Sequence, residues 1–275
     1  MTLNLNKCNS ISFTRSFSPI QADYEFEGYQ LKRVKIIKDL GVWLDCRMTY
    51  KHHLDITIGR ATSILSLVKR FSKEFDDPYV TRSLYLSLVA PILEYANVVW
   101  MPFFKCDVKR IESVQKQFLI FALRNLGWRD QYVLPAYENR LKLINMASLR
   151  DRQLLTCCML VYDIIHGNMN CTDLRQMITH RNLKYSFRNR LPLVEQFYSS
   201  SYTQNNPLNR SIRIFNYYFD EICDGLCRLS FKNYIRNKIS LDKFLLLWLV
   251  LRYFCKFVEK NFRFFQFFSE LFLKQ

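Results

Sequence analysis

The spacing of apolar residues changes near residue 46 and divides the chain into two structural regimes. Between about residues 10 and 45, apolar and polar residues alternate, and turn residues such as Gly28 and Gly41 separate the alternating runs. A period of two residues is typical of β-strands, because successive side chains of a strand point to opposite faces. This segment therefore predicts a small antiparallel β meander.

After Asp45 the apolar residues recur every three or four positions, which is the period of an α-helix. The apolar face of the first helix is predicted to consist of Leu54, Ile58, Ala61, Leu65 and Val68. A second helix is predicted to begin at Asp77-Pro78, because Asp is a preferred N-cap and Pro suits the first helical turn. Pro91 is expected to kink this second helix, since proline removes one backbone hydrogen bond.

The remainder of the chain also favours helices. Three further helical patterns cover residues 106–125, 135–147 and 148–166. Residues 171–206 are more polar and predict loops with short elements, and residues 209–236 predict one or two last helices. The predicted fold class is therefore α+β and mostly α, with the strands confined to the N-terminal part.

The tail after residue 236 differs from the rest of the chain, because it is dense in phenylalanine and follows no heptad pattern. Its unbroken apolar run, 244–251, is far shorter than the roughly 18–20 residues that a membrane span needs. Three interpretations stay open: a helix packed on the body, a helix lying on a membrane surface, or an ending produced by a shifted reading frame. Together the patterns predict four segments, 1–46, 47–128, 129–235 and 236–275.

Charge adds a candidate function to this outline. The 275 residues include 40 Lys and Arg against 24 Asp and Glu, which gives a formal net charge of +16. An excess of this size favours a polyanionic partner, either nucleic acid or an anionic membrane. It is densest between residues 32 and 73, where we select six candidate phosphate-binding residues, Lys38, Arg47, Lys51, Arg60, Lys69 and Arg70. The alternative is an ordinary solvated charged face.

Cysteine and histidine usage narrows the chemistry. The nine cysteines form no CxxC pair, and the first 20 residues hold no continuous apolar run of the kind found in signal peptides. We therefore expect reduced thiols and an intracellular location, in the cytoplasm or the nucleus. His52 and His53 are adjacent and would point in different directions on a helix, and no cysteine spacing matches a zinc site. The sequence predicts no metal site and no bound cofactor.

A series of short motifs gives the chain its most specific signal. In chain order they are Leu3-Asn4-Leu5-Asn6-Lys7-Cys8, Lys38-Asp39-Leu40-Gly41-Val42-Trp43-Leu44-Asp45, Leu84-Tyr85, Leu88-Val89, Pro91, Leu93-Glu94-Tyr95-Ala96, Val99-Trp100, Arg110-Ile111-Glu112, Val114-Gln115-Lys116, Phe118-Leu119, Leu126-Gly127-Trp128, Leu134-Pro135, Tyr137, Arg140-Leu141 and Asn206-Pro207-Leu208-Asn209-Arg210. Their order and spacing resemble the C-terminal part of reverse transcriptases from non-LTR (LINE-type, jockey-like) retrotransposons, over roughly residues 1–235.

The resemblance implies a role for each segment. Residues 1–46 would be the end of the palm, 47–128 a helical thumb, and 129–235 the post-thumb region. The residues Leu40, Gly41 and Val42 would form a primer grip, in which glycine allows a close approach of the backbone. The thumb would contact the backbone of RNA or of an RNA–DNA hybrid, without reading its sequence.

The resemblance also implies what the chain lacks. The family's polymerase site needs acidic residues on two palm motifs that hold Mg²⁺, and those motifs would precede this chain. Phe75-Asp76-Asp77 does not replace them, because no residue separates the aromatic from the acidic pair and because it follows the grip. We therefore expect a fragment that has no catalytic residues and is inactive alone, although the full parent enzyme would need Mg²⁺.

Two alternatives to residual nucleic-acid binding stay open. The chain could be a helical interaction module or an inert relic, which associates with itself or with a separately encoded palm fragment. It could also bind a membrane surface through its tail, although we do not expect a membrane as its main partner.

Overall fold

The computed structural model describes most of the chain up to residue 239. The described residues are 8–16, 18, 22–75, 77–127, 134–181, 192–198, 200–219, 223 and 225–239. The motif at 3–7, Asp76, Trp128 and the tail from residue 240 lie outside them. The described part is mostly helical with a few short N-terminal strands, so the predicted fold class is confirmed.

Among the described residues the strands form three separate pairs, and the prediction of one antiparallel meander is wrong in this respect. They are β1 (Asn9–Ser10), β2 (Glu25–Phe26), β3 (Tyr29–Gln30), β4 (Lys32–Arg33), β5 (Ile36–Asp39) and β6 (Val42–Asp45). β2–β3 and β5–β6 are antiparallel, whereas β1–β4 is parallel. The first four strands have two residues each, and β2, β3 and β4 bury neither face, so nothing joins them into a wider sheet.

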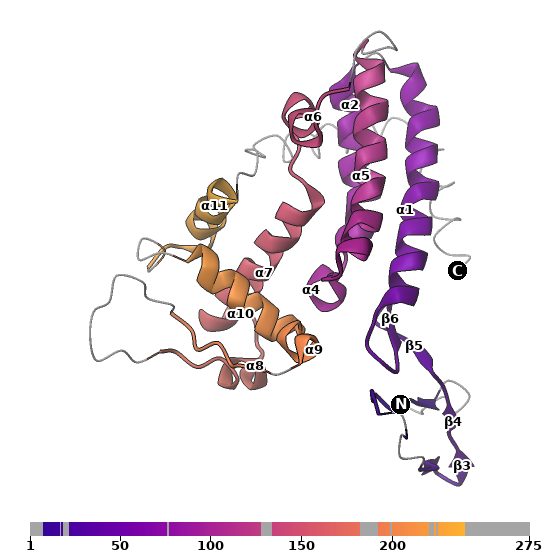
Figure 1. The fold of residues 1–275 in the computed structure, drawn as a ribbon, viewed down its shortest axis with the longest axis vertical. Helices are drawn as coiled ribbons and strands as arrows, with labels where there is room; N and C mark the ends of the chain where they lie inside the picture. The colour runs from indigo at the N-terminus through magenta and orange to yellow at the C-terminus, as the bar shows by residue number, and fades with distance from the viewer. Residues whose placement is uncertain are drawn as a thin grey trace.

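The first predicted helix is present as α1 (Lys51–Phe71). Leu54, Ala61, Leu65 and Val68 are buried as expected, and Ile58 is partly buried. α1 packs beside α5 (Lys105–Asn125), and Figure 1 shows these two helices running nearly parallel, with the strands continuing below α1. α5, the third predicted helix, therefore forms one layer together with α1.

The second predicted helix begins as expected and then breaks twice. The Asp77 carboxylate accepts a hydrogen bond from the Tyr79 N–H at 2.8 Å, which caps α2 (Pro78–Leu84). A π-helical turn, Tyr85–Val89, precedes α3 (Ala90–Glu94), which contains Pro91. Because Pro91 has no N–H to donate, the regular ladder cannot pass through it, and the wider turn accommodates the interruption. Ala96, with a φ of 49°, then separates α3 from α4 (Asn97–Trp100).

The later helices also follow their predictions. They are α6 (Tyr137–Ile144), α7 (Leu149–Ile165), α8 (Thr172–Gln176), α9 (Ser201–Gln204), α10 (Pro207–Tyr218) and α11 (Arg228–Lys238). Figure 1 shows α7, α10 and α11 grouped on the side of the molecule away from α1. The polar segment around residues 171–206 holds only short elements, as expected.

The buried apolar residues form two clusters. The first surrounds Tyr85 and Phe118, whose rings stack with centroids 4.1 Å apart, and includes Trp100. The second lies between α7, α10 and α11, where the Tyr162 and Phe231 rings stack at 4.5 Å. α7 belongs to both clusters, because its first residue packs in the first and its later turns pack in the second. The predicted domain boundaries are not tested by this arrangement and stay predictions.

The membrane-surface alternative depends on the tail, which lies outside the described residues. Within the described ranges, none of the helices combines the length and the apolarity that crossing a membrane would require.

Candidate nucleic-acid interface

The predicted grip residues form the tip of the β5–β6 hairpin. Leu40 and Gly41 both have positive φ, 44° and 87°, as a two-residue type I′ turn requires. The Leu40 side chain is 85% exposed at this tip, whereas Val42 is buried. A Cβ atom on Gly41 would lie 3.2 Å from the Tyr95 ring, so glycine is needed here for its backbone conformation and for the approach of Tyr95.

Contacts from Tyr95, which follows α3, and from His52 and His53 of α1 fix the hairpin to the helical body. The Tyr95 hydroxyl donates a hydrogen bond to the Leu40 carbonyl at 2.7 Å. The Trp43 N–H donates to Nδ1 of the buried His53 at 3.3 Å, and the Trp43 ring meets the His52 ring edge-on at 5.2 Å. The hairpin is therefore a fixed extension of α1.

The charge state of His53 follows from the same contacts. Its Nδ1 accepts the Trp43 N–H, so the ring proton sits on Nε2, which lies 3.4 Å from the Thr57 hydroxyl. Burial, together with the neighbouring His52, lowers the pKa of His53 from 6.5 to about 4. The ring is thus neutral at physiological pH, and it serves as a connection between the hairpin and α1.

Asp45, the last residue of the grip-like motif, organises the chain between the hairpin and α1. Its carboxylate accepts the backbone N–H groups of Arg47 at 3.0 Å, Thr49 at 2.9 Å and Tyr50 at 2.8 Å, and the Thr49 hydroxyl at 3.0 Å. Burial alone would raise the pKa of Asp45, but these hydrogen bonds outweigh it and lower the pKa below 3.8. Asp45 thus holds the loop that leads into α1, including the N–H of Tyr50, the N-cap residue, whose own side chain makes no capping hydrogen bond.

The six predicted phosphate-binding residues differ in how accessible they are. Five of them are exposed: Lys38, Arg47, Lys51, Arg60 and Arg70. Lys69 is only half exposed, because its ammonium lies 6.0 Å from the centre of the Phe121 ring on α5. Burial, with a smaller effect of Arg124, lowers the pKa of Lys69.

Helix geometry also distributes the basic residues around α1. Lys51 and Lys69 are 18 residues apart, so they lie on one line of the helix, separated by about 27 Å. Arg60 falls on the opposite side of the helix from that line, and Arg70 points away from the buried stripe. The charges therefore surround the exposed part of α1 and do not converge on one point.

Two residues that the sequence did not point to complete this region. The Arg15 guanidinium lies 3.2 Å from the centre of the Tyr202 ring and donates to the Arg47 carbonyl at 3.2 Å. The Tyr202 hydroxyl donates to the same carbonyl at 2.7 Å, which ties α9 to the start of α1 across 155 positions of sequence. No local pattern marks such a long-range contact.

Other motif residues hold the helices together from inside. Arg152 on α7 donates to the Glu94 carboxylate at 2.6 Å and to the Gln115 side-chain oxygen at 3.0 Å. Gln115 in turn donates to the Ala147 carbonyl at 2.7 Å. These contacts connect α3, α5 and α7. They give Glu94 and Gln115, polar residues of two motifs, a structural role.

Glu112 and Arg210 have similar structural roles. The Glu112 carboxylate accepts the Tyr137 hydroxyl, and burial together with this carboxylate raises the pKa of Tyr137. The buried Arg210 donates to the Val98 carbonyl at 2.5 Å and to the Met101 carbonyl at 3.0 Å, so it caps the end of α4. Burial lowers the pKa of Arg210.

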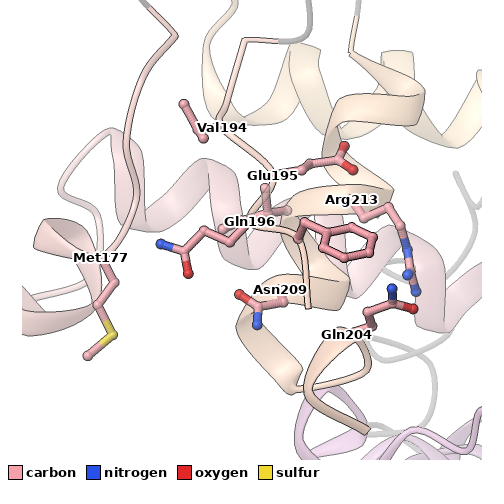
Figure 2. Close-up of a pocket in the computed structure, with 9 residues that line it drawn as sticks. Met177, Val194, Glu195, Gln196, Gln204, Asn209 and Arg213 are labelled. Carbon is pink, nitrogen blue, oxygen red and sulfur yellow. The ribbon is translucent and has the colours of Figure 1, made fainter. Parts of the chain in front are cut away.

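A cavity of about 290 Å³ lies between the segment 192–198 and α10. Figure 2 shows the amide side chains of Gln196, Gln204 and Asn209 around it, with Arg213 on the side of Gln204 and Met177 on the opposite side. The amides are engaged locally, since Gln204 donates to the Tyr198 carbonyl and Asn209 to the Thr203 carbonyl, both at 3.1 Å. In the described ranges, no three His, Cys, Asp or Glu side chains lie where they could hold a metal ion together.

Comparison with known proteins yields one distant similarity. The chain is 29% identical over 115 residues to a protein of Drosophila melanogaster named "Probable RNA-directed DNA polymerase from transposon BS". The match covers 41% of this chain and 12% of that protein. No protein-family model and no solved structure matches the chain. The similarity supports a reverse-transcriptase-like origin in a transposon sequence.

Proposed function

We propose that the chain is a thumb-like fragment of a retrotransposon RNA-directed DNA polymerase and binds RNA or an RNA–DNA hybrid independently of sequence. The observation that carries the proposal is the set of exposed cations on β5, on α1 and on the loop that joins β6 to α1. The distant similarity to the Drosophila polymerase supports this choice of polyanion.

The positions of the charges favour contacts to a phosphate backbone. Lys38 lies on the fixed hairpin, Arg47 on the loop that Asp45 organises, and Lys51, Arg60 and Arg70 on the exposed part of α1. Cations that point in several directions from one helix can each meet a phosphate group, whereas base recognition needs side chains that converge on one groove position. Each cation that neutralises a phosphate releases counterions, so the affinity should fall steeply with salt.

We also infer that the chain does not extend primers by itself. The observation that supports this is the role of Asp77, whose carboxylate caps α2 and is therefore engaged in the fold. Mixing the purified chain with a primed template, Mg²⁺ and nucleotides tests the inference, and any template-directed extension would overturn it.

The binding proposal is tested by fluorescence anisotropy with an RNA–DNA hybrid, titrated from low to physiological salt. The test variant reverses three exposed charges of α1, Lys51→Glu, Arg60→Glu and Arg70→Glu. Lys69 is left unchanged, because its side chain packs against Phe121 and its reversal would also disturb the α1–α5 contact.

A matched control reverses three exposed cations on other elements, Lys105→Glu, Lys142→Glu and Arg175→Glu. Both variants lose the same net charge, so a general electrostatic effect would weaken them equally. We expect the α1 variant alone to lower the slope of log affinity against log salt by about two to three. Equal slopes for both variants, or no binding by the unmodified chain at low salt, would refute the proposal.

A second candidate function is self-association through the N-terminal strands. Strands usually bury one face, but large apolar side chains are exposed in this region. These side chains are Phe13, Tyr24, Phe26, Tyr29, Ile36 and Leu40. Sedimentation equilibrium over a hundredfold concentration range tests it, with Tyr29→Ser and Leu40→Ser as the variant. A concentration-independent monomer mass would exclude this candidate.

A further inference from the structure

A second cavity, of about 310 Å³, is lined by residues of α7 and α11, by Ala147 and by Glu94 of α3. The charged residues of its lining are Glu94, Arg152, Arg228, Lys232 and Arg236. The three cations of α11 follow one another at intervals of four residues, which places them on one face of the helix. α11 packs on α7 through Phe231 and Ile235, which are fully buried.

The charges around this cavity do not balance. Arg152 is paired with Glu94 at 2.6 Å, and Arg228 is paired with Asp163, also at 2.6 Å. Within the described part of the chain, neither Lys232 nor Arg236 has a carboxylate within salt-bridge distance. The cavity therefore carries an excess of two positive charges on half-buried side chains.

This excess of positive charge is unfavourable in a partly desolvated site. Burial lowers the pKa of Lys232, and the nearby Arg236 and Arg228 lower it further. Burial also lowers the pKa of Arg236. Cations held together in a partly desolvated site repel one another, and an anion bound between them would remove that repulsion.

We propose that the α7–α11 cavity is a phosphate-binding site in which Lys232 and Arg236 are the direct ligands and Arg228 lies at the rim. A phosphate group matches the site because it carries up to two negative charges and several acceptor oxygens, which suit one ammonium and one planar guanidinium. A monocarboxylate would leave one of the two cations uncompensated. The phosphate comes either from a nucleic-acid backbone or from a free phosphate compound.

The site is independent of the proposed function of α1. Its ligands lie on α11, whose Phe231 and Ile235 belong to the second apolar cluster, whereas the predicted thumb-like cations lie on β5, on α1 and on the loop before α1. The two sites can therefore be tested by variants that share no residue, and the failure of one proposal leaves the other standing.

The test measures binding of inorganic phosphate and of pyrophosphate to the full chain by isothermal titration calorimetry at constant ionic strength. Acetate serves as the carboxylate probe. We expect saturable binding of pyrophosphate that weakens at least tenfold in Lys232→Gln/Arg236→Gln. The control Lys105→Gln/Lys142→Gln removes the same charge from exposed positions outside the cavity and should bind as tightly as the unmodified chain.

A conservative variant separates binding from folding. Lys232→Arg keeps the charge at the cavity, so it should retain pyrophosphate binding to within a few fold, whatever the stability of the double variant. The absence of saturable binding of both phosphate probes by the unmodified chain would overturn the proposal. An equal loss in the control variant, or acetate binding as tight as pyrophosphate binding, would overturn it too.

Competition identifies the source of the phosphate. A short single-stranded RNA that displaces pyrophosphate from the α1 charge-reversed chain would assign the site to a nucleic-acid backbone. Pyrophosphate binding that the RNA does not displace would assign it to a free phosphate compound. Both results support a phosphate site, and they specify its natural ligand.

Discussion

Replacing Asp45 by alanine should destabilise the junction between the hairpin and α1 more than its partial exposure suggests. The Asp45 carboxylate accepts three backbone N–H groups and one hydroxyl within residues 47–50. Two residues of this short loop, Met48 and Tyr50, have positive φ of 53° and 57°, a conformation that costs roughly 1–2 kcal/mol for a residue with a side chain. The carboxylate is the group that holds them in this conformation.

The magnitude follows from these contacts. A hydrogen bond to a charged group contributes about 1.5–3 kcal/mol, and the Asp45 carboxylate accepts four hydrogen bonds. The acceptor is shared and partly solvated, so the contributions are smaller than their sum. We expect Asp45→Ala to lower the free energy of unfolding by about 2–4 kcal/mol, and Asp45→Asn by roughly half as much because one side-chain acceptor remains.

The measurement is urea unfolding followed by far-UV circular dichroism, with Asp39→Ala as the control. Asp39 is exposed at the end of β5, so its replacement should change the free energy of unfolding by less than about 0.5 kcal/mol. Because the pKa of Asp45 is lowered in the fold, its charge-dependent contribution is complete only well above the unfolded pKa of 3.8, and it disappears as the pH falls through the lowered value. If Asp45→Ala and Asp39→Ala have equal effects, the role assigned to Asp45 in ordering the loop before α1 is wrong.

Three further predictions concern the same framework. The pKa of His53 is about 4 in the fold and 6.5 when unfolded, so stability should fall by about 2 kcal/mol between pH 7.5 and pH 5, and His53→Leu should abolish this change in urea titrations. Gly41→Ala should cost about 1–2 kcal/mol, because its φ is 87° and the new methyl group would contact the Tyr95 ring; unchanged urea midpoints would contradict this. Arg210→Lys should cost about 2 kcal/mol, because one ammonium cannot reach both carbonyls that the guanidinium caps, whereas Arg213→Lys on the exposed face should be neutral in thermal melts.

The helices were predictable from sequence because their signals are local. A buried stripe such as the one on α1 repeats every three or four residues, and the caps at Asp77 and Gly127 lie next to the helix ends that they define. The arrangement of the strands was not predictable, since alternation over two residues does not specify a partner. The parallel pairing of β1 with β4 joins Asn9 to Lys32, and no turn signal encodes such a contact.

The candidate sites divide in the same way. The exposed charges of α1 were visible in composition, but their distribution around the helix follows only from where the apolar stripe is buried. Lys69 is an example. The sequence predicts that its charge is free to bind phosphate, whereas in the structure the side chain lies beside Phe121 and is half-buried. The α7–α11 cavity could not be predicted, because Arg152 and Lys232 meet there across 80 positions of sequence.

The residues that carry the family resemblance are mainly structural, and this decides what the resemblance can establish. Glu94, Glu112, Gln115 and Arg210 are engaged inside the helical body, and Asp45 is engaged at its edge. Such residues specify how helices join, so they would persist in a chain that keeps the scaffold and has lost any activity of its parent. Exposed cations are replaced at little cost in stability. Binding measurements on the exposed Lys51 and Arg60 therefore bear on function in a way that further sequence similarity at the motif positions would not.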